Sequence, residues 1–226
     1  MTRSGEHNNP GLYEGVYTYQ EAARLLNVTV SRVSRWADGY VYPLRYGTRS
    51  SRPILQAREH KPRVLSFNEL MELFFVREFL AFGVSVPHIR NTAEALANVV
   101  GEFPFTKRKV LVNGRELLVR YTDEILQRPD IGQLVAGFAE EFCKQVEIAD
   151  DVISRYYPQG FERQILLAKG LRGGEPVVSS SGIPTRIIYA LWEQEKDVDT
   201  VAEYYDVTSA EVSSALRYEG EWRLAA

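Results

Sequence analysis

Residues 17–36 read YTYQEAARLLNVTVSRVSRW and decide the fold of the N-terminal part of the chain. Thr18 and Glu21 have the spacing of a capping box, in which the two side chains satisfy free backbone N–H groups at a helix start. After a break in the apolar spacing, Thr29 can cap a second, short helix that runs through Trp36. The stretch therefore predicts a helix, a tight turn and a second helix.

The outer face of the second predicted helix suits a DNA major groove. Val30 and Val33 are expected to point inward, which leaves hydroxyl and guanidinium side chains outside. Trp36 fits both sides, because it can pack inward or border the contact face. The residues expected to contact DNA from this helix are Thr29, Ser31, Arg32, Arg35 and Trp36. A basic face that is only solvated would have a similar composition.

The segment 40–63 is rich in arginine and holds enough Gly, Pro and Tyr for a β-hairpin, or wing. Such a wing would lie along the phosphate backbone. The residues expected to bind phosphate are Arg45, Arg49 and Arg52.

Basic residues are concentrated at one end of a weakly acidic chain. The 226 residues carry a formal net charge of -3. Residues 1–65 hold ten basic and five acidic side chains, or +5, so the remaining residues sum to -8. This asymmetry is typical of a protein in which one small module meets phosphates and the rest meets water or protein.

A central region between two modules is expected to contain helices and one β-hairpin, in a fold that is mainly α. The expected elements are a helix over 91–100 with Leu96, Val99 and Val100 buried, a hairpin over 107–121 around an Asn-Gly turn, and a helix over 131–146. The expected domains are residues 1–90, 91–160 and 161–226.

No arrangement of side chains indicates catalysis or a metal, so we expect a non-enzyme without cofactor. Cys143 and three scattered histidines match no zinc spacing. The acidic pairs at 140–141 and 150–151 fit a solvated helix face better than a metal or acid–base site, because helix neighbours point about 100° apart. No apolar run reaches the ~18 residues of a membrane helix, and the first ten residues are polar, so we expect a cytoplasmic protein.

A shift of 179 positions aligns the first helix-turn-helix with a second one near the C-terminus. It places Asn27-Val28-Thr29 over Asp206-Val207-Thr208, and Glu211 repeats the capping-box spacing after Thr208. Arg32 becomes Glu211, and further acidic residues surround it. Such a face repels phosphate, so we expect it to bind protein or to form a dimer.

Two sets of residues are candidates for contact with a protein partner. One set lies on the acidic face, and the other on a tail expected to follow the last helix near residue 218. They are Glu203 and Glu211 in the first set, and Trp222 and Arg223 in the second. The alternative for the tail is that its Trp folds back onto the helix-turn-helix core while its Arg is solvated.

The 17–36 motif resembles the MerR-like winged-helix family, whose N-terminal modules read roughly Y-T-x-x-E-A-A-x-L-x-x-V-x-x-x-x-V-x-R-W. The stretch 65–90 looks like the third and fourth helices of that family. The resemblance implies a homodimer on duplex DNA with an inverted repeat. The wing is long for the family, and the downstream cysteine cluster of its metal sensors is missing, which disfavours a metal-responsive activator.

Residues 174–187, with Ala215-Leu-Arg-Tyr218, resemble a short domain of unknown function found in small antitoxin-type proteins, here expected as a homeodomain-like helix-turn-helix. The family's usual Gly-Thr-Arg is replaced by Pro184-Thr-Arg186. The two resemblances together match the larger VapB-type antitoxins. They imply a type II antitoxin that neutralises a PIN-domain ribonuclease toxin and represses its own promoter. The alternative is a stand-alone MerR-like transcriptional regulator.

Overall fold

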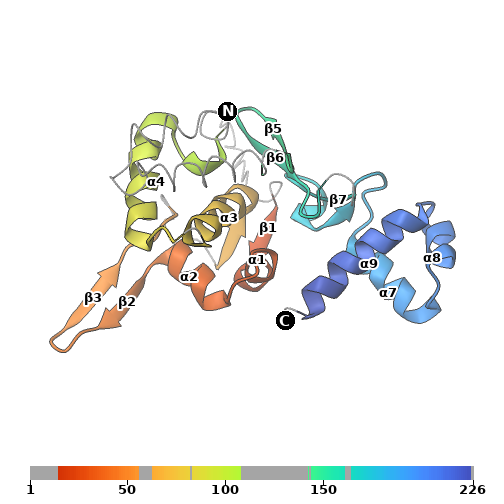
Figure 1. Ribbon diagram of the computed structural model, residues 1–226, viewed down its shortest axis with the longest axis horizontal. Helices are drawn as coiled ribbons and strands as arrows, with labels where there is room; N and C mark the ends of the chain where they lie inside the picture. The colour runs from red at the N-terminus through yellow and green to blue at the C-terminus, as the bar shows by residue number, and fades with distance from the viewer. Residues whose placement is uncertain are drawn as a thin grey trace, which may run out of the picture.

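The computed structural model describes residues 15–55, 63–81, 83–107, 142, 144–160 and 164–224 (Figure 1). These residues are mainly helical and carry three small antiparallel sheets, which confirms the expected mainly α class. The N-terminal helices lie at one end of the molecule and three C-terminal helices at the other, with a four-stranded sheet between them (Figure 1).

The N-terminal part is a helix-turn-helix followed by a projecting hairpin and two longer helices. Its elements are β1 (Val16–Thr18), α1 (Tyr19–Leu25), α2 (Val30–Asp38), β2 (Tyr40–Pro43), β3 (Thr48–Ser51), β4 (Val64–Ser66), α3 (Phe67–Ala81), α4 (Val86–Val100) and the 3-10 helix η2 (Pro104–Thr106). The capping box is confirmed, because Thr18 N donates to the Glu21 carboxylate at 2.7 Å and Glu21 N donates to Thr18 Oγ1 at 3.2 Å. Strand β1 pairs with β4, and β2 with β3.

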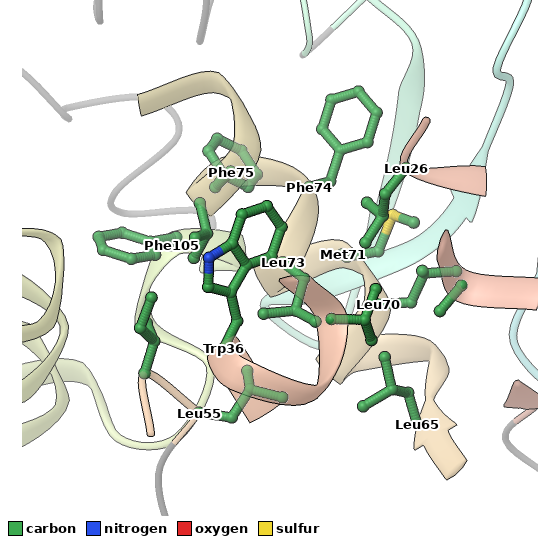
Figure 2. Packing of buried hydrophobic residues seen from close by; sticks show 14 of the residues in the cluster. Leu26, Trp36, Leu55, Leu65, Leu70, Met71, Leu73, Phe74, Phe75 and Phe105 are labelled. Atoms are coloured by element: carbon green, nitrogen blue, oxygen red, sulfur yellow. The ribbon is translucent and has the colours of Figure 1, made fainter. Parts of the chain in front are cut away.

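Helix α3 is the centre of the larger core. Eleven of its fifteen residues are buried, because β1, β4, α4, η2 and β6 all contact it. Its aromatic side chains stack with rings from η2, β6 and residue 142, and Figure 2 shows part of this packing. Each fully buried ring of this kind contributes roughly 1.5–3 kcal/mol through the hydrophobic effect.

One residue of helix α4 (Val86–Val100) that was expected to be buried is exposed. The helix begins at Val86 and continues through the expected stretch 91–100, and Leu96 is buried as predicted. Val99, however, is exposed, so the prediction that it is buried is wrong. The buried face of α4 follows Ile89, Thr92, Ala93 and Leu96, and Val99 lies off that face.

The four-stranded sheet was not expected from the sequence. Its strands are β5 (Val146–Ala149), β6 (Val152–Tyr156), β7 (Ile165–Ala168) and β8 (Val177–Val178), in that order and all antiparallel. The pair β6 and β7 spans the expected domain boundary after residue 160. Residue 146 begins a strand, so the expected helix end there is wrong. The rest of the helix over 131–146, except helical Phe142, and the hairpin over 107–121 beyond Lys107 lie outside the described residues.

Asp150 and Asp151 form the turn between β5 and β6, rather than part of a solvated helix face. Both have left-handed backbone angles, φ 50° and 65°. Asp tolerates this conformation because its short polar side chain can bond locally, and two such residues make the tight turn of a two-residue hairpin. The prediction of solvent exposure is confirmed, whereas the helical setting is wrong.

The C-terminal part is a three-helix unit packed on β7 and β8. Its helices are α7 (Thr185–Glu195), α8 (Val198–Tyr205) and α9 (Ser209–Leu224). They share a second core, in which Ile165 and Val178 of the sheet contact the apolar faces of the helices. Tyr218 is buried and α9 continues to Leu224, so the expected tail after residue 218 is wrong: this stretch is helical.

Candidate nucleic-acid interface

The two helix-turn-helix units share one turn geometry. Asn27 and Asp206, which the 179-residue shift aligns, both have left-handed backbones, with φ 50° and 52°. In each unit the next residue closes the turn, as Val28 N donates to Ala23 O at 2.9 Å and Val207 N donates to Ala202 O at 3.0 Å. The internal repeat seen in the sequence is therefore present in the backbone.

Helix α2 presents its N-terminal half and its arginines to solvent. Thr29 caps the helix, because its Oγ1 accepts from Arg32 N at 3.3 Å and lies 3.1 Å from Ser31 Oγ. The Arg32 side chain is exposed, as expected for a base-contacting residue. The Arg35 guanidinium lies over the Tyr40 ring, 5.2 Å from its centroid, which fixes the arginine between the helix and the wing.

Two expectations for α2 are wrong. Trp36, placed in the contact set, is only 5% exposed and packs in the main core. Its backbone oxygen also accepts from Ile54 N at 2.7 Å, so the chain returning from the wing passes next to it. Val30, expected to be buried, is 40% exposed because the first turn of α2 lies beyond the core. Val33 is buried as predicted.

The wing carries both arginine and exposed aromatic side chains. Strands β2 and β3 pair Tyr42 with Arg49, and Leu44 N donates to Gly47 O at 2.9 Å to close the tip. Tyr46 at the tip is 86% exposed, and the Arg45 guanidinium lies 5.7 Å from its ring centroid. The hairpin projects away from the rest of the molecule (Figure 1).

Helix α4 anchors the base of the wing. Arg90 donates through Nε to Pro53 O at 3.2 Å and through Nη2 to Ser51 Oγ at 3.1 Å. Arg52, expected to bind phosphate, forms an ion pair with Glu94 at 2.9 Å. Both partners remain exposed, so Arg52 can still reach an anion, but the nearby carboxylate offsets part of its charge.

Gly39 sets the direction in which the wing leaves α2. Its backbone, at φ 73° and ψ -171°, lies in a region that only glycine adopts readily. A Cβ there would lie 2.4 Å from Ser51 O and 2.9 Å from Pro53 N, both of which are backbone atoms. We expect Gly39→Ala to lower the free energy of unfolding by at least about 2 kcal/mol, measured by urea denaturation followed by circular dichroism.

Gly47→Ala is the matched control, because Gly47 also has a positive φ, 90°, but a Cβ there would meet nothing within 4 Å. Gly47→Ala should lower the free energy of unfolding by about 1 kcal/mol, because it adds backbone strain but no steric clash. Equal losses for the two variants would contradict the role given to the Gly39 contact.

The acidic residues expected to bind a partner separate in the structure. Glu203 is exposed on α8. Glu211 is only 5% exposed, so its assignment to the surface is wrong. It accepts from Thr208 N at 2.7 Å and from Ser180 Oγ at 2.5 Å. Burial opposes ionisation, yet these hydrogen bonds hold the pKa of Glu211 below its ordinary value. The side chains of Trp222 and Arg223 lie outside the described residues.

The sequence did not reveal the contact between the N-terminal and C-terminal parts. Buried Tyr17 of β1 donates its hydroxyl to Gly174 O at 2.9 Å. Burial raises the pKa of Tyr17, which keeps this donor protonated. Beside the bond lies a pocket of about 270 Å³, lined by residues that include Arg24, Arg186 and Glu219. The two adjacent glycines at 173–174 signal a close backbone contact in the sequence, but they do not identify Tyr17 as the residue that makes it.

Within the described residues, no cluster of three or more His, Cys, Asp or Glu side chains is placed to hold a metal ion. No helix among these residues is both long and apolar enough to cross a membrane.

A family model matches part of this chain, and two known proteins match most of it. Residues 165–218 match the family described as "Protein of unknown function (DUF433)". The chain is 26% identical over 220 residues to a Mycobacterium tuberculosis (strain ATCC 25618 / H37Rv) protein named "Putative antitoxin VapB45", and the match covers 89% of this chain and 92% of that protein. The X-ray structure of Rv2018 from Mycobacterium tuberculosis has the same fold, with a TM-score of 0.70, 24% identity, and coverage of 88% and 96%. Together the two sequence matches support an antitoxin-type protein.

Proposed function

We propose that the chain is an antitoxin that binds duplex DNA at its own promoter through the N-terminal winged helix-turn-helix, which we take as MerR-like, and neutralises a PIN-domain ribonuclease. The observation that carries this proposal is the contrast between its two helix-turn-helix units. They share one turn geometry, but α2 exposes arginines where the aligned position of α9 holds a buried glutamate. Similarity to a protein named as an antitoxin supports the toxin-directed half.

The N-terminal unit has the parts needed for DNA contact. Arg32 is exposed near the N-terminus of α2, and the N-terminal residues of a recognition helix are the ones that contact base edges. Arg45 and Arg49 lie on a projecting hairpin that can follow the phosphate backbone. A module of this size buries too little surface for tight specific binding alone, so two copies should bind an inverted repeat as a homodimer.

Arg32→Ala and Arg49→Ala should have different effects on DNA binding. Loss of a base-reading arginine should weaken binding to the promoter site by about 1–3 kcal/mol and relax specificity. Loss of a phosphate contact should weaken all sequences alike and reduce the salt slope by about one. Fluorescence anisotropy on promoter and random duplexes, over a range of salt concentrations, measures both quantities. Equal effects of both variants on both duplexes would show that the roles are wrongly assigned.

Toxin neutralisation is tested with the protein encoded beside this gene. The two chains are co-expressed, purified together, and assayed for ribonuclease activity with and without this chain. We expect a stable complex in which the ribonuclease is inhibited. A neighbouring protein that does not bind this chain and does not cleave RNA would contradict the antitoxin role. The DNA-binding role is tested separately by the anisotropy measurement.

A stand-alone regulator is the second candidate, and the pocket beside the Tyr17–Gly174 contact favours it. The pocket lies against α1 of the DNA-binding unit and is lined by charged and apolar side chains. A small molecule bound there would touch both parts of the chain. This candidate predicts operator binding that responds to a metabolite and is unchanged by any neighbouring gene product.

A further inference from the structure

We propose that Tyr204, with the carboxylates of Glu203 and Asp206, forms the surface to which a protein partner with a basic face binds. This inference rests on the antitoxin role proposed above. It assigns partner binding to α8, rather than to Glu211 or to the end of the chain.

Among the described residues of the C-terminal unit, Tyr204 is an exposed large hydrophobic side chain, at 72%. Helix α8 buries Val201 and Ala202 against the second core and leaves Tyr204 exposed to solvent. Its ring meets the Tyr205 ring edge-on, with centroids 4.9 Å apart and planes at 83°. A tyrosine supported in this way offers a large contact area at a low cost in side-chain entropy.

Acidic residues are frequent in the segment that contains this aromatic pair. Residues 193–206 hold six acidic side chains and one basic one. The basic one, Lys196, lies over the Trp192 ring at 4.5 Å. Among the residues that the structure describes, no lysine or arginine forms an ion pair with Glu203 or Asp206. The negative charge at this surface is therefore left for a partner to neutralise.

These observations identify the class of partner. An aromatic anchor inside a charged rim has the anatomy of a protein–protein interface. The negative charge excludes nucleic acid, because phosphates would be repelled. Complementarity then requires a positively charged protein face with an apolar recess for the tyrosine ring.

The test uses the full-length chain and the protein encoded beside its gene. The variants are Tyr204→Ala, Glu203→Lys and, as a matched control, Tyr46→Ala, which removes another largely exposed tyrosine, from the wing. Binding to the neighbouring protein and to promoter DNA is measured for each variant by biolayer interferometry, and circular dichroism melts check the fold. We expect Tyr204→Ala to weaken partner binding at least about tenfold and to leave DNA binding unchanged. Glu203→Lys should slow association and reduce its salt dependence. Tyr46→Ala should leave partner binding unchanged.

Partner binding that is unaffected by Tyr204→Ala, or that Tyr46→Ala weakens equally, would overturn the proposal. Loss of self-association in Tyr204→Ala, with the partner still bound, would show that a second copy of this chain occupies the surface, and would overturn it as well. A wild-type chain that binds no neighbouring protein would remove the antitoxin role together with this inference. A partner that binds without using Tyr204 would remove the inference alone.

Discussion

Trp36→Ala is expected to unfold the N-terminal unit rather than to weaken one DNA contact. The indole is buried in the cluster that includes Leu55, Leu73 and Phe105 (Figure 2), and truncating a buried tryptophan costs about 3–5 kcal/mol. Urea denaturation followed by circular dichroism measures this loss. Binding to promoter and random DNA should fall together at temperatures where the unit unfolds.

Two variants separate this packing role from direct DNA contact. Trp36→Phe keeps most of the apolar volume and should cost clearly less than the alanine variant. Arg32→Ala, at an exposed position of the same helix, should change stability by no more than about 0.5 kcal/mol while weakening promoter binding. If Trp36→Ala kept its stability and lost only promoter affinity, the indole would be a contact residue after all.

The second large effect concerns Glu72, a buried carboxyl group of α3. Both of its oxygens lie near Phe105 N, at 3.3 and 3.2 Å. Burial raises its pKa to about 8, while the backbone N–H groups of Phe105 and Thr106 and the charge of Lys107 act to lower it. The folded chain therefore holds this proton at pH values where the unfolded chain, with a pKa near 4.5, has released it.

The sign of the pH dependence follows from that difference. Stability from this group is fully present below pH 4.5 and is lost as the pH rises to about 8. The loss is up to about 1.4 kcal/mol per pH unit, on the order of 5 kcal/mol in total. Glu72→Gln keeps an acceptor oxygen but cannot ionise. We expect it to remove this slope and to be more stable than the wild type at pH 8.5, as measured by denaturant titrations from pH 5 to 9.

Glu102→Gln is the control, because Glu102 is exposed in the loop between α4 and η2, and η2 contacts α3. Its stability curve should run parallel to that of the wild type. A Glu72→Gln curve that also ran parallel would mean that the buried carboxyl group does not ionise over this range.

Local signals in the sequence predicted the helix starts and the two helix-turn-helix units well. Thr18 and Thr208 each precede a glutamate by three residues, and both pairs form the expected capping box, as does the pair Ser66 and Glu69 at the start of α3. These signals work because cap and helix interact within a few residues. The same motif indicates that Glu211 is engaged by its own helix, but it does not decide burial, because Glu21 forms the same capping box and stays exposed.

Features that depend on distant contacts were not predictable from local patterns. The four-stranded sheet has short strands, and β8 has only two residues, too few for a clear alternation. The ion pair of Arg52 with Glu94 joins residues 42 positions apart. Trp36 fitted both faces of α2 in the sequence, and its burial depends on how the chain returns from the wing.

The hydrogen bond from Tyr17 to Gly174 links the N-terminal part of the molecule directly to the loop that precedes the C-terminal helices. A Cβ at Gly174 would lie 2.3 Å from the Tyr17 hydroxyl, so the two segments meet with no slack between them. Displacing the loop at 173–174 must either break this bond or pull on β1. Because β1 is paired with β4, and β4 leads directly into α3, such a displacement reaches the helix at the centre of the larger core. Helix α1, which contacts both β1 and α2, offers a second route from this bond to the helix expected to contact DNA.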